Sequence, residues 1–158
     1  MQKLKKVRII ADYQFGRGAG KALFPENVEF QLSNTKRVRQ ILLNGKRLAT
    51  LRAKDGLFTL SIYGADRLHK HFPYPHLRVV MNKEASPFIA QGKTAFARHV
   101  VAVDPEIRAG EEVILVDEND KLLATGKTLL CASEMLSFKK GVAVYVRHGV
   151  VVDNDRNL

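Results

Sequence analysis

Apolar side chains near the start of the chain recur at helical spacing. Over residues 3–15, the apolar residues lie near helical spacing, which predicts a helix; they are Leu4, Val7, Ile10, Ala11 and Phe15. The glycine-rich string GRGAG, residues 16–20, is expected to end this helix because glycine is a poor helix former.

Alternation of apolar and polar residues replaces the helical pattern further along. It predicts a half-buried strand over residues 28–32 and an antiparallel meander over residues 37–64. Two dipeptides that supply positive φ in tight hairpins divide the meander: Asn44-Gly45 and Asp55-Gly56. A short helix is expected over residues 64–71. The first half is therefore predicted as a helix followed by an antiparallel sheet.

Short apolar runs separated by turn residues fill the second half. We predict strands over 77–82, 95–103, 111–117, 121–130 and 141–152. Two short helices are expected between them, one over residues 83–91 with Gly92 after its end, and one over residues 133–138 capped by Ser133. Mostly β structure with two short helices predicts a small mixed barrel.

A domain boundary is expected in the segment HFPYPHL, residues 71–77. Pro73 and Pro75 disfavour helix and push the residues before them toward extended backbone. The fold class is thus α+β: a basic α+β domain over residues 1–74, a mostly β pseudo-barrel over 75–152, and a flexible tail over 153–158.

Charge differs sharply between the two halves. Residues 1–76 hold 15 Lys and Arg against 5 Asp and Glu, whereas residues 77–158 hold 11 of each. The whole formal charge of +10 therefore lies in the first half, which favours a polyanion, above all nucleic acid, as the partner of that half. A lysine-rich solvated surface is the alternative.

The remaining composition excludes several classes. No apolar run reaches the roughly 18–20 residues that a membrane span needs, and no apolar region follows the basic start MQKLKK, so we expect a cytoplasmic protein with no membrane partner. The single cysteine, Cys131, lies in an apolar run and is interpreted as an inert core thiol. One cysteine and five scattered histidines give no zinc-binding pattern.

The string FGRGAGKAL resembles a phosphate-binding loop only superficially. Phe15 stands where the first glycine of that motif belongs, and Ala22 replaces the hydroxyl residue that binds magnesium. We therefore expect a structural turn, in which Arg17 and Lys21 contact RNA phosphate.

Four separated segments carry a resemblance to a known family. A strand and short helix ending at glycine, then DPEIRAGEEVILVDENDKLLATGK, SEM and GVAVYVRHG, follow the order found in PUA domains, over about residues 77–150. The string DYQFGRGAGKALFP, residues 12–25, resembles the domain that precedes the PUA domain in archaeosine tRNA-guanine transglycosylase and archaeosine synthase. The chain thus resembles the C-terminal tRNA-binding half of those enzymes.

The resemblance implies an RNA-binding face in the second half. In PUA domains the glycine loop after the first helix and the last strand form this face, which here corresponds to Gly92, Lys93, Thr94, Ala95, Phe96, Arg147 and His148. Small loop residues let backbone N–H groups approach phosphate. Phe96 either stacks an unpaired terminal base or points into the core. Arg147 either contacts phosphate or forms a structural ion pair, and His148 is as well explained as a surface residue.

A second basic stripe is predicted in the first half. Arg37 and Arg39 alternate along one strand, and hairpin pairing is expected to bring Arg47 alongside them, so that the stripe follows an RNA backbone. A solvated sheet face is the alternative. His69, Lys70 and His71 extend the footprint only weakly.

No enzyme is predicted. The acidic residues Glu111, Glu112, Asp117, Glu118 and Asp120 are interpreted as a solvated rim, and we expect no catalytic residue, cofactor or metal. The family's catalytic barrel, typically about 250 residues, exceeds this chain.

We therefore interpret the chain as a non-catalytic RNA-binding protein, most of all for tRNA. Its expected role is to anchor the acceptor end for archaeosine modification, beside a catalytic transglycosylase subunit. A PUA-containing translation or ribosome-assembly factor is the alternative.

Overall fold

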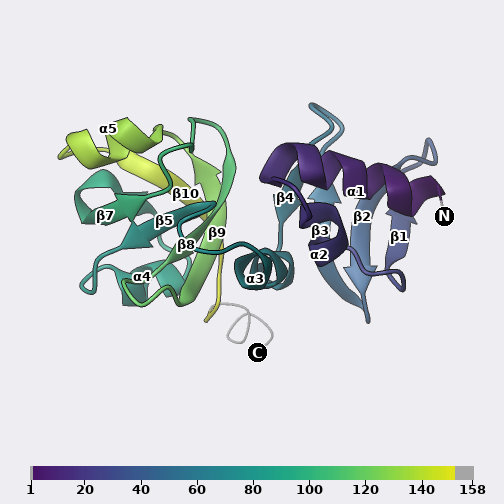
Figure 1. Cartoon of the computed structure of the whole chain (residues 1–158), viewed down its shortest axis with the longest axis horizontal. Coiled ribbons are helices and arrows are strands. Elements are labelled where there is room, and N and C mark those ends of the chain that lie inside the picture. Colours follow the sequence, from purple (N-terminus) through teal and green to yellow (C-terminus); the bar gives the residue numbers. More distant parts are fainter. Residues whose placement is uncertain (1, 152–158) are drawn as a thin grey trace. The chain divides into compact units, whose positions relative to one another are not determined.

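The computed structural model of the protein describes residues 2–151, so the expected tail over 153–158 lies outside the described residues. The chain divides into two compact units, residues 1–71 and residues 72–158. The elements of unit 1 are labelled in Figure 1 and are α1 (Gln2–Phe15), α2 (Ala19–Leu23), β1 (Glu29–Leu32), β2 (Val38–Leu43), β3 (Lys46–Leu51), β4 (Phe58–Leu60) and α3 (Ile62–His71).

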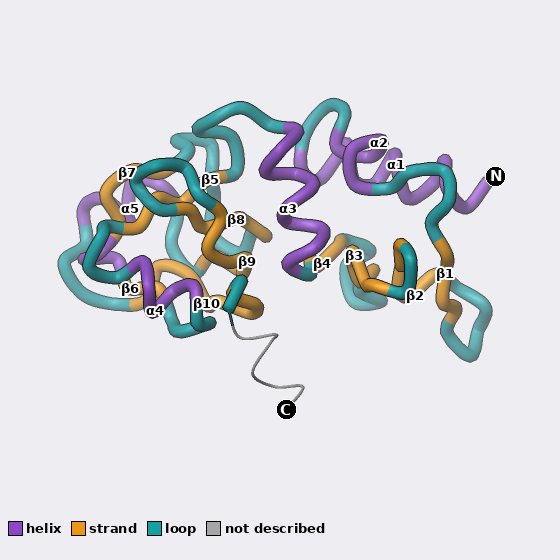
Figure 2. The backbone as a smooth tube through the Cα atoms, turned by 90° about the horizontal axis from the view of Figure 1, so that it is seen from below, coloured by secondary structure: helices purple, strands orange, loops and turns teal. Residues whose placement is uncertain are grey.

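Unit 1 is an antiparallel sheet with helices on one face. The strand order is β1-β2-β3-β4, and each neighbouring pair is antiparallel. Figure 2 shows α1 and α2 on the same side of this sheet. Val7, Ala11 and Phe15 of α1 are buried, as are Ile41 and Phe58 of the sheet. The predicted helix and meander are therefore confirmed, while the short helix α2 was not predicted.

The side chain of Gln14 ties α1 to the edge strand β4. Its Nε2 donates to the carbonyl oxygen of Phe58 at 2.8 Å, and its Oε1 accepts from the N–H of Phe58 at 2.7 Å. The amide thereby satisfies both backbone groups of one strand residue, as a neighbouring strand would.

Two glycines allow helices of unit 1 to approach their neighbours closely. A Cβ at Gly20 of α2 would lie 2.3 Å from the carbonyl oxygen of Arg8 in α1. A Cβ at Gly64 of α3 would lie 2.2 Å from the carbonyl oxygen of Leu48 in β3. Neither position has room for a larger residue, because backbone atoms cannot give way as a flexible side chain can.

Unit 2 is a mixed six-stranded sheet with two short helices. Its elements are β5 (Arg78–Met81), α4 (Ser86–Ala90), β6 (Ala95–Phe96), the 3-10 turn η1 (Ala97–His99), β7 (Val100–Val103), β8 (Glu112–Val116), β9 (Leu122–Thr128), α5 (Ala132–Ser137) and β10 (Val142–Gly149). The order is β6-β10-β9-β8-β5-β7, and only β5 and β8 pair in parallel among the described strands. Val79, Met81, Leu115 and Val144 belong to its core cluster.

The single strand predicted over residues 95–103 is wrong. That segment is split, because β6 pairs with β10 at one edge of the sheet while β7 pairs with β5 at the other. Only the three residues of η1 connect the two edges. Three residues span a short distance, so the sheet has to curl until its edges nearly meet. The predicted barrel is thus confirmed, and with it the α+β fold class.

The start of α5 also differs from expectation. The N-cap is Cys131 rather than Ser133, and the Glu134 carboxylate accepts the N–H of Cys131 at 3.0 Å. Because Cys131 is half-buried at a helix start, its interpretation as a core thiol is wrong. The hydrogen bonds from the backbone and side chain of Cys131 lower the pKa of Glu134 below its usual value.

Candidate nucleic-acid interface

A hollow on unit 1 gathers cationic side chains from several segments. It encloses about 800 Å³ between α1, the turn before β2, and the end of β3. We name it the basic groove after its six cations: Lys3, Lys6, Lys36, Arg37, Arg39 and Arg52. None of the described residues that line it is a carboxylate.

Apolar side chains form part of the same hollow. Ile10, Val38 and Leu51 line it and are only partly buried. Ser33 and Thr35 add two hydroxyls at the turn, which bond each other at 3.0 Å. The basic groove therefore combines cationic side chains, which we call its rim, with apolar side chains, which we call its floor.

Arg52 is held in place at one side of the basic groove. Its Nη2 lies 2.7 Å from Oδ2 of Asp55, and its Nε donates to Oδ1 at 3.2 Å. Burial raises the pKa of Asp55, but the hydrogen bond from the N–H of Leu57 and the charge of Arg52 outweigh it, so the pKa lies below its usual value. The pair remains ionised at neutral pH and fixes the guanidinium.

The predicted basic stripe is only partly assembled. Arg37 and Arg39 both line the basic groove, where they join Lys3 and Lys6 of α1. Arg47 does not join them, because the register pairs it with Leu42 near the far end of β2, and its Nη1 donates to Thr50 at 3.1 Å. A register shift between Ile41 and Leu42 separates the pairs on either side.

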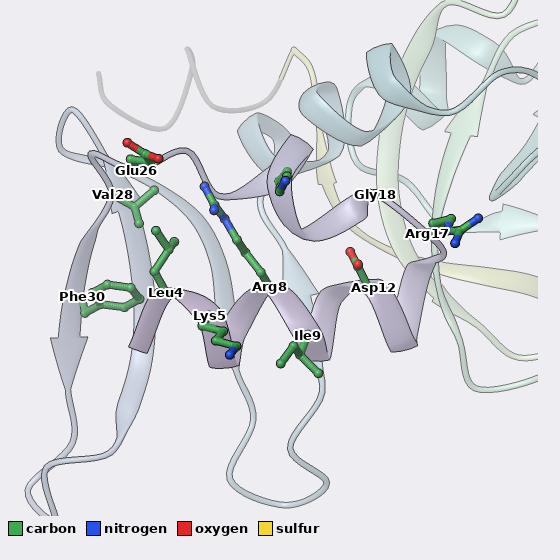
Figure 3. A pocket seen from close by; sticks show the side chains of 11 residues that line it. Leu4, Lys5, Arg8, Ile9, Asp12, Arg17, Gly18, Glu26, Val28 and Phe30 are labelled. Atoms are coloured by element: carbon green, nitrogen blue, oxygen red, sulfur yellow. The ribbon is translucent and has the colours of Figure 1, made fainter. Parts of the chain in front are cut away.

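Arg17 and Lys21 line a second hollow on unit 1, of about 910 Å³. Figure 3 shows this hollow and labels Arg17. We name it the glycine-turn groove, since Gly18 lines it with a φ of 87°. It differs chemically from the basic groove because two carboxylates, Asp12 and Glu26, also line it.

Some polar groups of the glycine-turn groove already have structural partners. Arg8, which Figure 3 shows rising from α1, donates from Nε to the carbonyl oxygen of Phe24 at 2.9 Å. Asp12 accepts the N–H of Gly20 at 2.6 Å. These bonds hold α1 and α2 together, so Arg8 and Asp12 have structural roles in unit 1.

The cluster of His69, Lys70 and His71 forms the last turn of α3 and already has partners within unit 1. Lys70 pairs with Asp66 one helical turn earlier at 2.9 Å, and Nε2 of His71 lies 3.4 Å from the carbonyl oxygen of Arg17. His69 also has interactions of its own.

In unit 2, the glycine loop and the last strand lie side by side. Gly92 follows α4 with a φ of 91°, and β6 after the loop pairs with β10. A Cβ at Gly149 would lie 2.7 Å from the backbone nitrogen of Gly92, so the end of β10 touches the loop. Left-handed backbone at Gly92 suits glycine alone among common residues without strain.

Residues of this loop differ in accessibility. Lys93 is exposed and Thr94 is half-buried, whereas the side chain of Ala95 is fully buried. Phe96 is 41% exposed, which favours a stacking surface over a core position. The guanidinium carbon of Arg98 lies 5.8 Å from the centre of the Phe96 ring, within the range of a cation–π contact.

Arg147 forms the ion pair that was one of its two predicted interpretations. Its Nη1 lies 2.5 Å from Oε2 of Glu112, whose side chain is only 2% exposed. Glu112 is therefore no part of a solvated rim, and this expectation is wrong for it. Asp120 likewise pairs with the buried Arg78 at 3.0 Å. His148 is half-buried opposite Thr125.

Sequence reasoning missed three groups of candidate residues. Lys3 and Lys6 line the basic groove, because their positions on α1 place them on the side that faces β2 and β3. Phe88 of α4 is 57% exposed, and its carbonyl oxygen accepts the N–H of Lys93 in the loop. Arg98 was hidden inside the segment predicted as one strand. Phe88 could have been found from the sequence, because it is an aromatic residue in the short predicted helix just before Gly92.

Within residues 2–151, no group of three or more His, Cys, Asp or Glu side chains is arranged to hold a metal ion. Within the same residues, no helix has both the length and the apolar character for crossing a membrane.

Comparisons with known protein families match both units. Residues 5–75 match the patch-forming domain C2 of tRNA-guanine transglycosylase, and residues 77–150 match the PUA domain. The chain is therefore a C2–PUA protein.

Its relatives by sequence are archaeal. The chain is 54% identical over 144 residues to a tRNA-guanine(15) transglycosylase of Pyrococcus furiosus. This aligned stretch covers 91% of this chain and 24% of the relative. It is 48% identical over 147 residues to that of Methanothermobacter thermautotrophicus, covering 92% and 22%. The chain spans about a quarter of the length of these curated relatives. The sequence match extends over both the C2 and the PUA domain of this chain.

Solved structures support the fold. A hypothetical protein from Pyrococcus horikoshii aligns with a TM-score of 0.72 at 24% identity, over 95% of this chain and 91% of that one. A conserved PUA domain protein from Thermoplasma acidophilum aligns with a TM-score of 0.65 at 19% identity, over 99% and 93%. Both show that the two-unit architecture occurs in other proteins.

Proposed function

We propose that this chain is a non-catalytic RNA-binding protein that holds tRNA for modification by a transglycosylase. The observation that carries the proposal is the pairing of a C2 domain with a PUA domain across residues 5–150 in a chain closely similar to tRNA-guanine(15) transglycosylases. The net charge of +10 suits a polyanionic partner.

The acceptor end of tRNA is the proposed ligand of unit 2. The loop Gly92–Phe96 places a left-handed glycine and an exposed ring beside the last strand. Backbone N–H groups of such a loop approach phosphate closely, and an exposed ring stacks on an unpaired base. Lys93 is the cation of this loop, since Arg147 is engaged by Glu112.

In this proposal the chemistry of base exchange belongs to a separate catalytic subunit. The relatives named for that activity are about four times as long as the matched portion. The described residues supply RNA contacts, and the partner supplies the reacting groups.

Gel-shift titration of the full chain with tRNA tests this function. We expect tight binding to intact tRNA and weaker binding to tRNA that lacks its single-stranded acceptor end. Phe96→Ala should weaken binding of intact tRNA by about 1–3 kcal/mol, the range for one stacked base, and leave the truncated tRNA unaffected. Phe138→Ala is the control, because Phe138 is also exposed but lies after α5.

Equal affinity for intact and truncated tRNA would refute acceptor-end anchoring. A base-exchange assay on the purified chain alone should show no incorporation, and incorporation would refute the non-catalytic role. Copurification with ribosomal subunits instead of a transglycosylase would favour a translation or ribosome-assembly factor.

A further inference from the structure

The two hollows of unit 1 are similar in size, but only the glycine-turn groove has carboxylates among the described residues that line it. The glycine-turn groove has two carboxylates among its lining residues, and Arg8 there donates to a backbone carbonyl. The basic groove has six cations and no carboxylate among the described residues around it. The charges of the lining residues, rather than the size of the hollow, therefore distinguish the basic groove as the candidate binding site.

The cations of the basic groove are distributed around the hollow. They come from α1, from the turn before β2, from β2 itself and from the residue after β3. A small anion needs donors that converge on one point. Charges spread along a hollow instead suit several phosphates in succession.

The floor of the basic groove argues for something more than phosphate. Ile10, Val38 and Leu51 present partly exposed apolar surface between the cations. A duplex presents its phosphates on the outside and keeps its bases stacked within, so it would leave this floor uncovered. An unpaired nucleotide can place its base on the floor and its phosphates at the rim.

We propose that the basic groove is a binding site for single-stranded RNA, with one base against the apolar floor and the flanking phosphates on the cationic rim. This inference rests on the proposed RNA-binding function and adds a second, separate site on unit 1. Arg52, fixed by Asp55, and Arg39 mark the β-sheet side of the rim, and Lys6 marks the helix side.

The probe is a fluorescent oligouridylate of about eight nucleotides, a length within the usual site size for single strands. Titrated against the full chain, the double variant Lys6→Glu/Arg37→Glu should bind it about tenfold more weakly, with a shallower salt dependence. The control Lys139→Glu/Lys140→Glu also reverses two exposed cations and lowers the net charge equally, but on unit 2. It should bind almost as the parent does.

Two further probes test the role of the base. A ribose-phosphate oligomer of the same length without bases should bind more weakly than oligouridylate, and so should a blunt RNA duplex. Equal affinity for the baseless oligomer would overturn base insertion, and preference for the duplex would overturn the single-stranded site. Circular dichroism and thermal melting confirm that each variant is folded.

The outcomes separate this site from the function on which it rests. If both double variants lose affinity equally, the groove is not the site, although tRNA binding that depends on the acceptor end would still stand. If oligouridylate and tRNA both fail to bind the parent protein, the proposed function and this inference fall together.

Discussion

The two units of this protein differ in how their cations are balanced by carboxylates. Unit 1 carries 15 Lys and Arg against 5 Asp and Glu, whereas residues 72–158 carry 11 of each. In unit 1, six cations surround a hollow that no described carboxylate lines. In unit 2, Arg78 and Arg147 are paired with Asp120 and Glu112, and each pair has one buried partner. Net charge and binding surface therefore have to be assessed unit by unit.

Under the proposed function, the two units would contribute to RNA binding differently. Unit 1 would supply long-range attraction, which depends on charge and is sensitive to salt. Unit 2 would instead act at short range, through the backbone of a loop with one cation, Lys93, and through an exposed ring. Binding by unit 1 should therefore respond to ionic strength, and binding by unit 2 to the form of the RNA end.

The largest expected effect is the salt dependence of tRNA binding. If about six phosphates are contacted, affinity should fall by roughly a thousandfold between about 50 and 200 mM salt.

The double variant Arg37→Glu/Arg39→Glu should weaken tRNA binding at low salt and reduce the slope of log affinity against log salt by about two. Filter binding over a salt series measures both. Arg47→Glu should change the slope less, because Arg47 lies outside the basic groove. An affinity that does not change with salt would contradict a charge-dependent contribution of unit 1 to tRNA binding.

A smaller effect is expected from overpacking each unit at a glycine. Gly64→Ala should destabilise unit 1 by about 1–3 kcal/mol, since the new Cβ would meet the Leu48 carbonyl oxygen at 2.2 Å. Gly126→Ala should do the same to unit 2, because its Cβ would meet the Tyr145 carbonyl oxygen at 2.3 Å.

Chemical denaturation followed by amide exchange in each unit provides the measurement. Loss of protection confined to the substituted unit would show that the units unfold independently, and loss in both would show one cooperative fold. Gly45→Ala is the matched control for crowding, because no heavy atom lies within 4 Å of its Cβ, so only its positive φ contributes.

The smallest expected effect concerns acid. The pKa of Asp55 is lowered in the folded state, so its contribution to stability is complete above the usual aspartate range and is lost as pH falls through the lowered value. Because the Asp55–Arg52 pair is partly exposed, the loss should amount to about 0.2–1 kcal/mol. Asp55→Asn should flatten this part of the pH–stability curve.

Glu134 is the corresponding group in unit 2, and its pKa is lowered as well. Glu134→Gln should therefore remove acid sensitivity from α5 without changing unit 1. Urea unfolding between pH 2.5 and 7, at intervals of about half a unit, would record both changes. An unchanged curve for Asp55→Asn would show that this ion pair contributes nothing measurable.

Much of the fold could be predicted because its signals are local. The helical spacing of apolar residues from Leu4 to Phe15 predicted α1, and Asn44-Gly45 predicted the β2–β3 hairpin, with positive φ at both residues. Gly92 was placed correctly after α4 for the same reason. Each of these features depends on residues a few positions apart.

The features that escaped prediction depend on distant partners. The break at Ala97–His99 exists because two strands join opposite edges of a curled sheet, which no local pattern encodes. The Arg147–Glu112 pair joins residues 35 positions apart. The basic groove likewise needs α1 beside β2 and β3, so Lys3 and Lys6 had no visible connection to Arg37 in the sequence.

The Gln14 amide has a consequence for how molecules of this protein meet one another. β4 is the last strand of its sheet, and such a strand offers open N–H and C=O groups to any passing chain. At Phe58 both groups are already occupied by Gln14. Gln14 thus occupies backbone groups through which the edge strands of two molecules would pair, and so helps to protect the protein from aggregation.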